Sequence, residues 1–228
     1  MVNAISFAGE RYKIISRHDF ELRYSPKNSQ KEVDETLLYF TQSYERLMKY
    51  LKVKPQKKIT VVLYGTVEEF IKESNRPGWQ GGSFQGVTLH LQPAGVLKEK
   101  GVLKTTIEHE SSHVFLNELT RGNCPLWLSE GFAVYFSGEM ESVKADLSYK
   151  PSTFNDLSKG IQSPKSHTHA LQYYKLSGSF VSFLISKYGH KKFHMMLAML
   201  RSGKPFSYAC KTLFAVTEKQ FFKILSKN

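Results

Sequence analysis

The order of the predicted elements is the feature that most constrains this fold. Segments with strand-like patterns all precede Gly101, and nearly everything after it has helical periodicity. An alternating α/β fold would interleave the two kinds of element, so this order predicts an α+β fold. At this length we expect one domain over 1–228, with a sheet-rich part at 1–100 and a helical part at 101–228.

The individual elements follow from hydrophobic spacing. Strands are predicted at residues 12–16, 20–24, 58–64 and 87–92, and helices at 30–51, 67–73, 102–120, 126–137, 170–187 and 190–201, with two short helices near the end. The first two strands alternate and are separated by Arg17-His-Asp19, which indicates a hairpin. Residues 77–86 are rich in glycine and predict a flexible, turn-rich stretch.

The helix predicted at 102–120 contains His109-Glu110-Ser-Ser-His113. Residues four apart lie on one face of a helix, so both imidazoles can bind a single metal ion. Glu110 flanks such an ion without sitting where a ligand would, and its carboxylate can take a proton from a metal-bound water. Two surface histidines beside a surface glutamate are the alternative interpretation of the motif alone.

A catalytic zinc site normally has three protein ligands and leaves a fourth position to water. The chain has no Cys-x-x-Cys pair, so histidines and carboxylates must supply the ligands. The metzincin pattern would place its third histidine at position 119, which is Leu119 here. Glu130 lies on the next predicted helix among apolar residues, after the helix stop at Arg121–Pro125. A buried acid is costly unless paired or metal-bound, so Glu130 is the candidate third ligand.

The two segments together resemble a known family. His109-Glu-Ser-Ser-His113 followed by Trp127-Leu-Ser-Glu-Gly-Phe-Ala133 is similar to the gluzincin pattern of aminopeptidase-type catalytic domains and smaller peptidase MA-like proteins. The resemblance implies a zincin (thermolysin-like) fold: an N-terminal twisted mixed sheet, an active-site helix beneath its edge strand and a helical C-terminal half. It implies one Zn²⁺ per chain, with Glu130 as the third ligand and Glu110 as the general base.

The resemblance implies two further features. Tyr174, three residues before Ser177, matches a tyrosine that hydrogen-bonds the developing oxyanion, with Tyr173 as the fallback and simple packing as the other interpretation. Gly86–Gln92 resembles the edge strand along which extended peptides bind. An open edge offers unpaired N–H and C=O groups to a peptide backbone, which makes this role physically reasonable.

The chain also departs from the large aminopeptidases. Ser129 replaces their usual asparagine, and the glycine-alanine-methionine-glutamate-asparagine motif that grips a substrate's N-terminus has no equivalent. We therefore expect a zinc-dependent endopeptidase that acts on peptide or protein substrates. The alternatives are a zinc hydrolase of a non-peptide (cell-wall) amide, and a polyanion-binding module on a metallopeptidase scaffold. The intact Glu110 argues against the binding module, because a scaffold without activity needs no base.

The remaining histidines and both cysteines are less informative. His167 and His169 are predicted to be two surface histidines in a loop. His190 and His194 are four residues apart, but no glutamate lies between them to act as a base. Cys124 and Cys210 could form a disulfide if the protein is exported, or be two ordinary thiols.

The net charge of +12 could attract a polyanion, with basic clusters at 52–58, 98–104 and 187–192. A solvated, lysine-rich surface is favoured, and nucleic acid is not expected because no aromatic-glycine RNA-binding signature is present. No apolar run is long enough for a transmembrane helix, and Met1–Glu10 does not resemble a signal peptide. We expect a soluble protein. A removed leader would leave the same sequence, so the compartment stays open, as does the oligomeric state.

Overall fold

The structure is a computed structural model that describes residues 4–5, 12–139 and 151–227. The chain divides into two compact units, Met1–Phe115 and Leu116–Asn228. The prediction of one catalytic domain over 1–228 stays a prediction. Most of the Met1–Glu10 segment, which we expected not to be a leader, lies outside the described residues. No helix among the described residues is long and apolar enough to cross a membrane.

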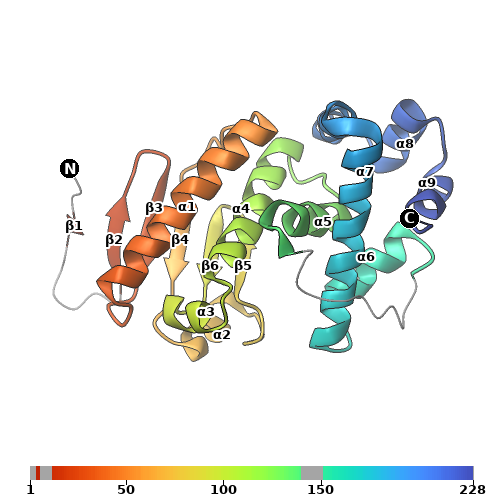
Figure 1. Cartoon of the computed structure of the whole chain (residues 1–228). Helices are drawn as coiled ribbons and strands as arrows, with labels where there is room; N and C mark the ends of the chain where they lie inside the picture. Colours follow the sequence, from red (N-terminus) through yellow and green to blue (C-terminus); the bar gives the residue numbers. More distant parts are fainter. Residues whose placement is uncertain (1–3, 6–11, 140–150, 228) are drawn as a thin grey trace. The chain divides into compact units, whose positions relative to one another are not determined.

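All the strands among the described residues lie in the first half of the chain (Figure 1). Its elements are β1 (Ala4–Ile5), β2 (Lys13–Ser16), β3 (Phe20–Tyr24), α1 (Gln30–Leu51), β4 (Ile59–Leu63), α2 (Val67–Ser74), β5 (Gly82–Gln85), β6 (Thr88–Leu91), α3 (Ala94–Glu99) and α4 (Leu103–Thr120). The predicted hairpin is confirmed, because β2 and β3 pair antiparallel. The helix predicted at 30–51 has the predicted bounds, and Ser29 and Glu32 form a capping box at its start.

The strands form one sheet in the order β1-β2-β3-β4-β6-β5. The central strands β3, β4 and β6 run parallel, whereas β1, β2 and β5 pair antiparallel with their neighbours. The sheet is therefore mixed, as predicted, and with the helices it gives the expected α+β class.

The prediction of which strand forms the edge of the sheet is wrong. Residues 86–92 were expected to form it, but β6 lies between β4 and β5 in the interior of the sheet. The terminal strand at that end is β5, inside the stretch predicted to be turn-rich. Gly86, with φ of 62°, begins a two-residue turn that pairs Gln85 with Thr88. The strand β5 was not predicted because this hairpin is rich in glycine and polar residues. Such residues have a low propensity for strands, although they are common in hairpin turns.

One face of the sheet is covered by α1 (Figure 1). Phe20, Leu22 and Tyr24 of β3 are buried, and the ring of Phe20 packs edge-on against that of Phe40 of α1, 4.8 Å between centroids. This alternation, buried at every second residue, is the pattern that predicted the strand.

The second unit is helical in its described residues. Its elements after α4 are α5 (Leu126–Ser137), α6 (Phe154–Gln162), α7 (His167–Arg201), α8 (Phe206–Phe214) and α9 (Glu218–Leu225). The two helices predicted at 170–187 and 190–201 are the two parts of α7, separated by the non-helical Gly189. The two short final helices are confirmed as α8 and α9. Helix α6 was missed, although Phe154, Leu157 and Ile161 are buried at helical spacing.

The core of the second unit is aromatic. Trp127 of α5 is fully buried and stacks on Phe154 of α6, with 4.3 Å between ring centroids. The other buried rings around this pair are Phe180, Phe206, Phe221 and Phe222. Rings of this size provide a large apolar area in each contact, so they hold α5 firmly against α6 and α7.

Both cysteines are free thiols. Burial raises the pKa of the Cys210 thiol to about 12 and raises that of Cys124 further, with a smaller contribution from the Glu130 carboxylate. A raised pKa keeps a thiol in its neutral form, which is a poor nucleophile.

Candidate active site

Helix α1 holds α4 in the first unit. The guanidinium of Arg46 lies 2.6 Å from the buried carboxylate of Glu108, the residue before His109. The ring of Tyr44 packs edge-on against Phe115, with 5.2 Å between centroids. An ion pair and a ring contact about two turns apart restrict both sliding and rotation of α4, which is what precise placement of the motif histidines requires.

The two motif histidines lie together on α4. Their ring centroids are 5.0 Å apart and the rings are at 71° to each other, as the four-residue spacing predicted. His113 is buried and His109 is half-buried. The pair can therefore offer two imidazole nitrogens to one ion.

Glu110 lies directly against β5. A Cβ atom placed on Gly82 would be 2.8 Å from the Cγ of Glu110 and 3.0 Å from the Cγ2 of Thr106. Only glycine lets the strand approach α4 this closely. Glu110 is buried, with its Cγ next to the terminal strand of the sheet, and Gly82 is a site residue that sequence reasoning missed.

Phe84 is a second missed residue of β5. Its ring stacks on the imidazole of His113, with 4.7 Å between centroids and 19° between planes. Gly82 and Phe84 are two residues apart on β5, and they contact Glu110 and His113, three apart on α4. Residues two apart on a strand point to the same face of the sheet. This spacing would have placed Gly82 and Phe84 on one face together, had β5 been recognised as a strand.

A buried amide anchors the segment that leads into β5. The Nε2 of Gln92, which is fully buried, donates hydrogen bonds to the carbonyl oxygens of Gly78 and Gln80, at 2.8 and 2.7 Å. The backbone N–H of Gln92 donates to the carbonyl of Gly81 at 3.0 Å. Three bonds to one residue after β6 hold the start of β5 in place, so the strand above Glu110 is not a loose loop.

In the second unit, Glu130 lies on α5 and is 9% exposed. The next residue, Gly131, contacts α7: a Cβ atom there would be 2.4 Å from the carbonyl oxygen of Ser177. The absence of a side chain at Gly131 allows the two helix backbones to touch, and this contact fixes α5 at the residue beside Glu130.

The three predicted ligands are grouped in the structure. One ligand atom from each of His109, His113 and Glu130 lies within 4.8 Å of the other two. Ligand atoms around one tetrahedral zinc ion are roughly 3.4 Å apart, given bonds of about 2.1 Å. Two imidazole nitrogens and one carboxylate oxygen are also the donor set of a catalytic zinc site with one open position. The types of ligand atom and their grouping are therefore compatible with a bound zinc ion.

The sequence of residues 39–220 matches the family model of the peptidase MA superfamily. The match covers most of the chain and includes the three candidate ligands. The chain belongs to the peptidase MA superfamily. This confirms the predicted family, and it supports a zinc metallopeptidase over the two alternatives that the sequence left open.

Solved structures of M1 zinc metallopeptidases are similar to this superfamily member at 16% identity and a TM-score of 0.49. One is a mutant two-domain enzyme bound to L-tryptophan, of which the match covers 50% against 98% of this chain. Another, from Deinococcus radiodurans, is a mutant bound to the substrate Tyr-Ser-Ala, with 48% and 93% covered. The chain spans about half the length of these enzymes. No curated protein matches the sequence significantly.

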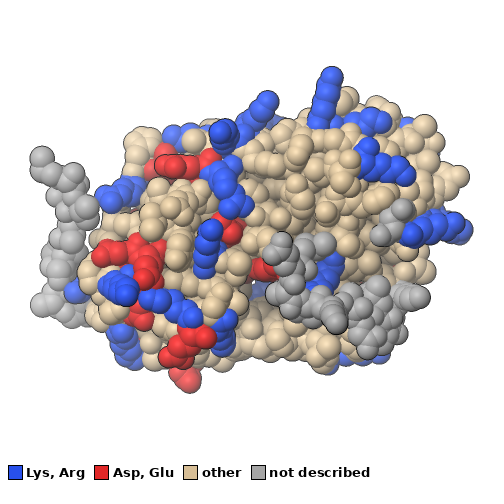
Figure 2. Space-filling view, in the orientation of Figure 1, with Lys and Arg blue, Asp and Glu red and all other residues tan. Residues whose placement is uncertain are grey.

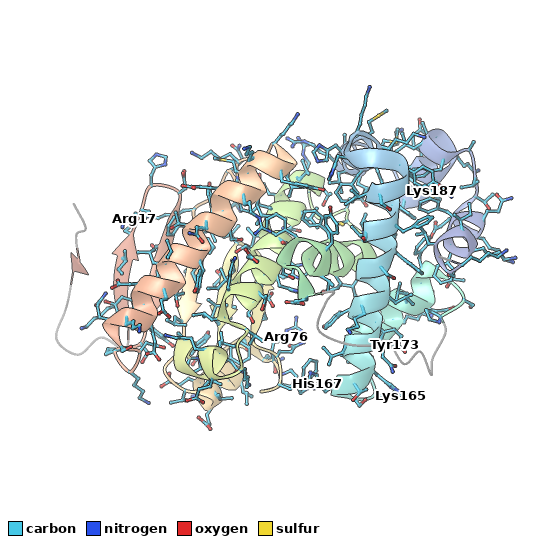
Figure 3. All side chains as sticks on the ribbon, viewed as in Figure 1. Arg17, Arg76, Lys165, His167, Tyr173 and Lys187 are labelled. Atoms are coloured by element: carbon cyan, nitrogen blue, oxygen red, sulfur yellow. The ribbon has the colours of Figure 1, made fainter. Side chains whose placement is uncertain are left out.

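The two candidate tyrosines of this peptidase MA member differ in their surroundings. Tyr173, labelled in Figure 3, is buried, and its ring lies so close to α6 that a Cβ atom on Gly160 would be 2.3 Å from Cζ. Tyr174 is half-buried and lies on the turn of α7 before Ser177. Tyr173 packs against α6, and the catalytic role of Tyr174 stays a prediction.

Among the described residues, no other histidine belongs to this group of possible metal ligands. His167 and His169 are in the first turn of α7, not in a loop as predicted, because the Ser166 hydroxyl caps the helix just before them. His190 and His194 follow the break at Gly189.

Lysines of two basic clusters form surface ion pairs. Lys54 lies 2.8 Å from Asp19, and Lys98 lies 2.6 Å from Glu35. The hydrogen bonds in these pairs lower the pKa of Asp19 and raise that of Lys98. Figure 2 shows lysine and arginine side chains spread over the visible face of the molecule. These observations favour a solvated basic surface; that nucleic acid is no partner stays a prediction.

Proposed function

We propose that this chain is a zinc-dependent endopeptidase with a thermolysin-like arrangement of its site. The observation that carries the proposal is the group of His109, His113 and Glu130, whose ligand atoms lie within 4.8 Å of one another in a member of a peptidase family. These three side chains would hold one zinc ion. When bound, zinc would polarise the scissile carbonyl and make water acidic enough to react at neutral pH.

Glu110 would act as the general base. Its carboxyl group would accept a proton from the attacking water and pass it to the leaving amine, as peptide hydrolysis requires. The neighbouring positions on α4 support this role, since Glu110 is adjacent to one candidate ligand and three residues from the other. Burial beneath β5 also keeps bulk water from competing for the proton.

The substrate would bind along β5, the terminal strand of the sheet. A peptide in extended conformation can add to such an edge through backbone hydrogen bonds, which need no particular side chain. Two facts support β5 over the strand first predicted: β6 is interior, and β5 lies over Glu110 and His113. A peptide paired with β5 would therefore pass close to the base.

Tyr174 would donate a hydrogen bond to the oxyanion that forms at the scissile carbonyl. Tyr174 lies on α7, one turn before Ser177. The backbone of Ser177 contacts Gly131, the residue directly after Glu130, and this supports the role. The Tyr174 hydroxyl and the Glu130 carboxylate would thus belong to neighbouring parts of the second unit.

The replacement of Glu110 by glutamine tests the mechanism. Glutamine keeps the size of the side chain but cannot accept a proton at neutral pH, so peptide hydrolysis should fall by at least about 10²-fold with zinc still bound. The control is His113→Ala, which should lose metal and activity together, as should Glu130→Ala. Metal content and cleavage of a broad peptide library are measured on all four proteins.

Two outcomes would sink the proposal. Near-normal activity of Glu110→Gln would take the base role from Glu110. A wild-type protein that binds zinc and cleaves no peptide would favour the cell-wall amide hydrolase or the polyanion-binding module.

Endopeptidase activity has its own test, because it rests on the missing amine-gripping motif. The wild-type protein should cleave peptides at internal bonds, whether or not their N-termini are acetylated. Mass spectra that show only stepwise loss of single N-terminal residues, and none from acetylated peptides, would make the enzyme an aminopeptidase.

A further inference from the structure

We infer that Phe84 is a positioning residue of the metal site, which holds the imidazole of His113 in the orientation that binds the ion. The inference rests on the proposed zinc site. It assigns to a strand residue a role that the gluzincin motif does not include.

The contact between the two rings is close and nearly parallel. The centroids of Phe84 and His113 are 4.7 Å apart and the planes are inclined by 19°. On the same imidazole, the ring of His109 packs at 71° with its centroid 5.0 Å away. The His113 ring is thus stacked on the ring of Phe84 and makes an edge-on contact with the ring of His109. The residue His113 is only 3% exposed.

A histidine ligand needs this kind of support. The torsion between Cβ and the imidazole ring is broad, so a ring without neighbours would sample many orientations, few of which aim a nitrogen at the metal. A flat ring lying parallel to the imidazole excludes most of that rotation. Holding the ligand in place before the ion arrives reduces the entropy lost on binding, which increases metal affinity.

Phe84 is itself held in place. It is opposite Leu89 in the register of β5 and β6, and Leu89 is fully buried. The start of β5 is anchored by the Gln92 amide through the carbonyls of Gly78 and Gln80. A ring fixed by a paired strand can orient a neighbour, whereas a ring on a mobile loop could not.

The experiment compares two replacements of Phe84 with a control on the same strand. Phe84→Leu keeps an apolar side chain but removes the flat ring, and Phe84→Tyr keeps the ring. Gln85→Ala changes an exposed neighbour on β5. For each protein, the zinc Kd is measured by competition with a chelator, and the visible spectrum of the cobalt-substituted protein reports the ligand geometry. Thermal unfolding of the metal-free proteins verifies that each variant folds.

We expect Phe84→Leu to raise the zinc Kd by about 10-fold and to change the cobalt spectrum, as loss of support around a ligand does. Phe84→Tyr and Gln85→Ala should remain within about twofold of the wild type. A wild-type Kd and spectrum for Phe84→Leu would overturn the inference, as would equal weakening by leucine and tyrosine. Failure of the wild-type protein to bind zinc would instead overturn the proposed function, and this inference with it.

Discussion

The backbone of α7 at Ser177 lies against Gly131 of α5, so close that a Cβ atom on Gly131 would be 2.4 Å from the Ser177 carbonyl oxygen. Carbon and oxygen atoms do not approach this closely without displacing one of the two helices. The residue before Gly131 is the candidate ligand Glu130. Both the packing of α5 on α7 and the position of this ligand therefore depend on having a glycine at position 131.

Gly131→Ala should therefore destabilise the protein by roughly 2 kcal/mol, the scale of overpacking in a core. The free energy of unfolding of the metal-free protein, measured by urea denaturation, gives this value. Gly86→Ala is the comparison, because Gly86 has a positive φ with nothing within 4 Å and its cost, roughly 1 kcal/mol, comes from backbone strain alone. If Gly131→Ala is the less destabilising of the two, the contact with Ser177 is looser than the structure shows.

Gly82→Ala should impair catalysis more than it impairs metal binding. The added methyl group would lie 2.8 Å from the Cγ of Glu110, a flexible side chain that can give way by moving. A displaced base lowers kcat, and small misplacements of catalytic groups can cost up to about 10²-fold; we expect at least about 10-fold. Zinc content should stay near the wild-type level, since the three atoms nearest to the new methyl group belong to Glu110, Thr106 and His90 and not to a candidate ligand. Unchanged kcat would mean that Glu110 is not the base or moves at no cost.

Replacing each tyrosine by phenylalanine separates their roles. Tyr174→Phe should lower kcat by about 10²-fold with the zinc content intact, as for loss of one oxyanion donor. Tyr173→Phe removes only a hydroxyl from a ring that packs on Gly160, so turnover should change little. Steady-state kinetics of both variants measure this. The reverse result would show that Tyr173 is the catalytic tyrosine.

The stability of the protein should depend on the titration of His90. Burial lowers the pKa of His90, with a smaller opposing effect from Glu73, and its Nδ1 lies 2.8 Å from the Tyr64 hydroxyl. Because the unfolded chain has the ordinary pKa of about 6.5, it binds a proton at a higher pH than the folded protein does. The stability contributed by neutral His90 is fully present above that pH and is lost as the pH falls towards the folded-state pKa.

Urea denaturation of the metal-free protein at pH 7.5 and pH 5.0 measures this loss. His90→Gln, which cannot titrate, should lose less stability than the wild type between the two conditions. Equal losses would exclude His90 as the source of the pH dependence.

Much of the site could be predicted from the sequence because its chemistry is local. The spacing of His109 and His113 places both on one helix face whatever surrounds the helix, and the 102–120 and 126–137 helices have nearly the predicted bounds. The confinement of the strand-like segments to residues before Gly101 was sufficient for the α+β class. Glu130 was accessible to the same reasoning, because an acid among apolar residues on a short helix needs a partner.

What only the tertiary structure decided concerns residues brought together from distant positions in the chain. Strand order is not encoded in the alternation of any one strand, so β6 was mistaken for the edge and β5 was not recognised. With β5 unrecognised, neither Gly82 nor Phe84 could be assigned to the site, although each contacts a motif residue more than 25 positions later. Helical spacing fixes which side chains share a face, whereas strand pairing and close packing depend on which backbones meet, and that is determined when the sheet assembles against α4.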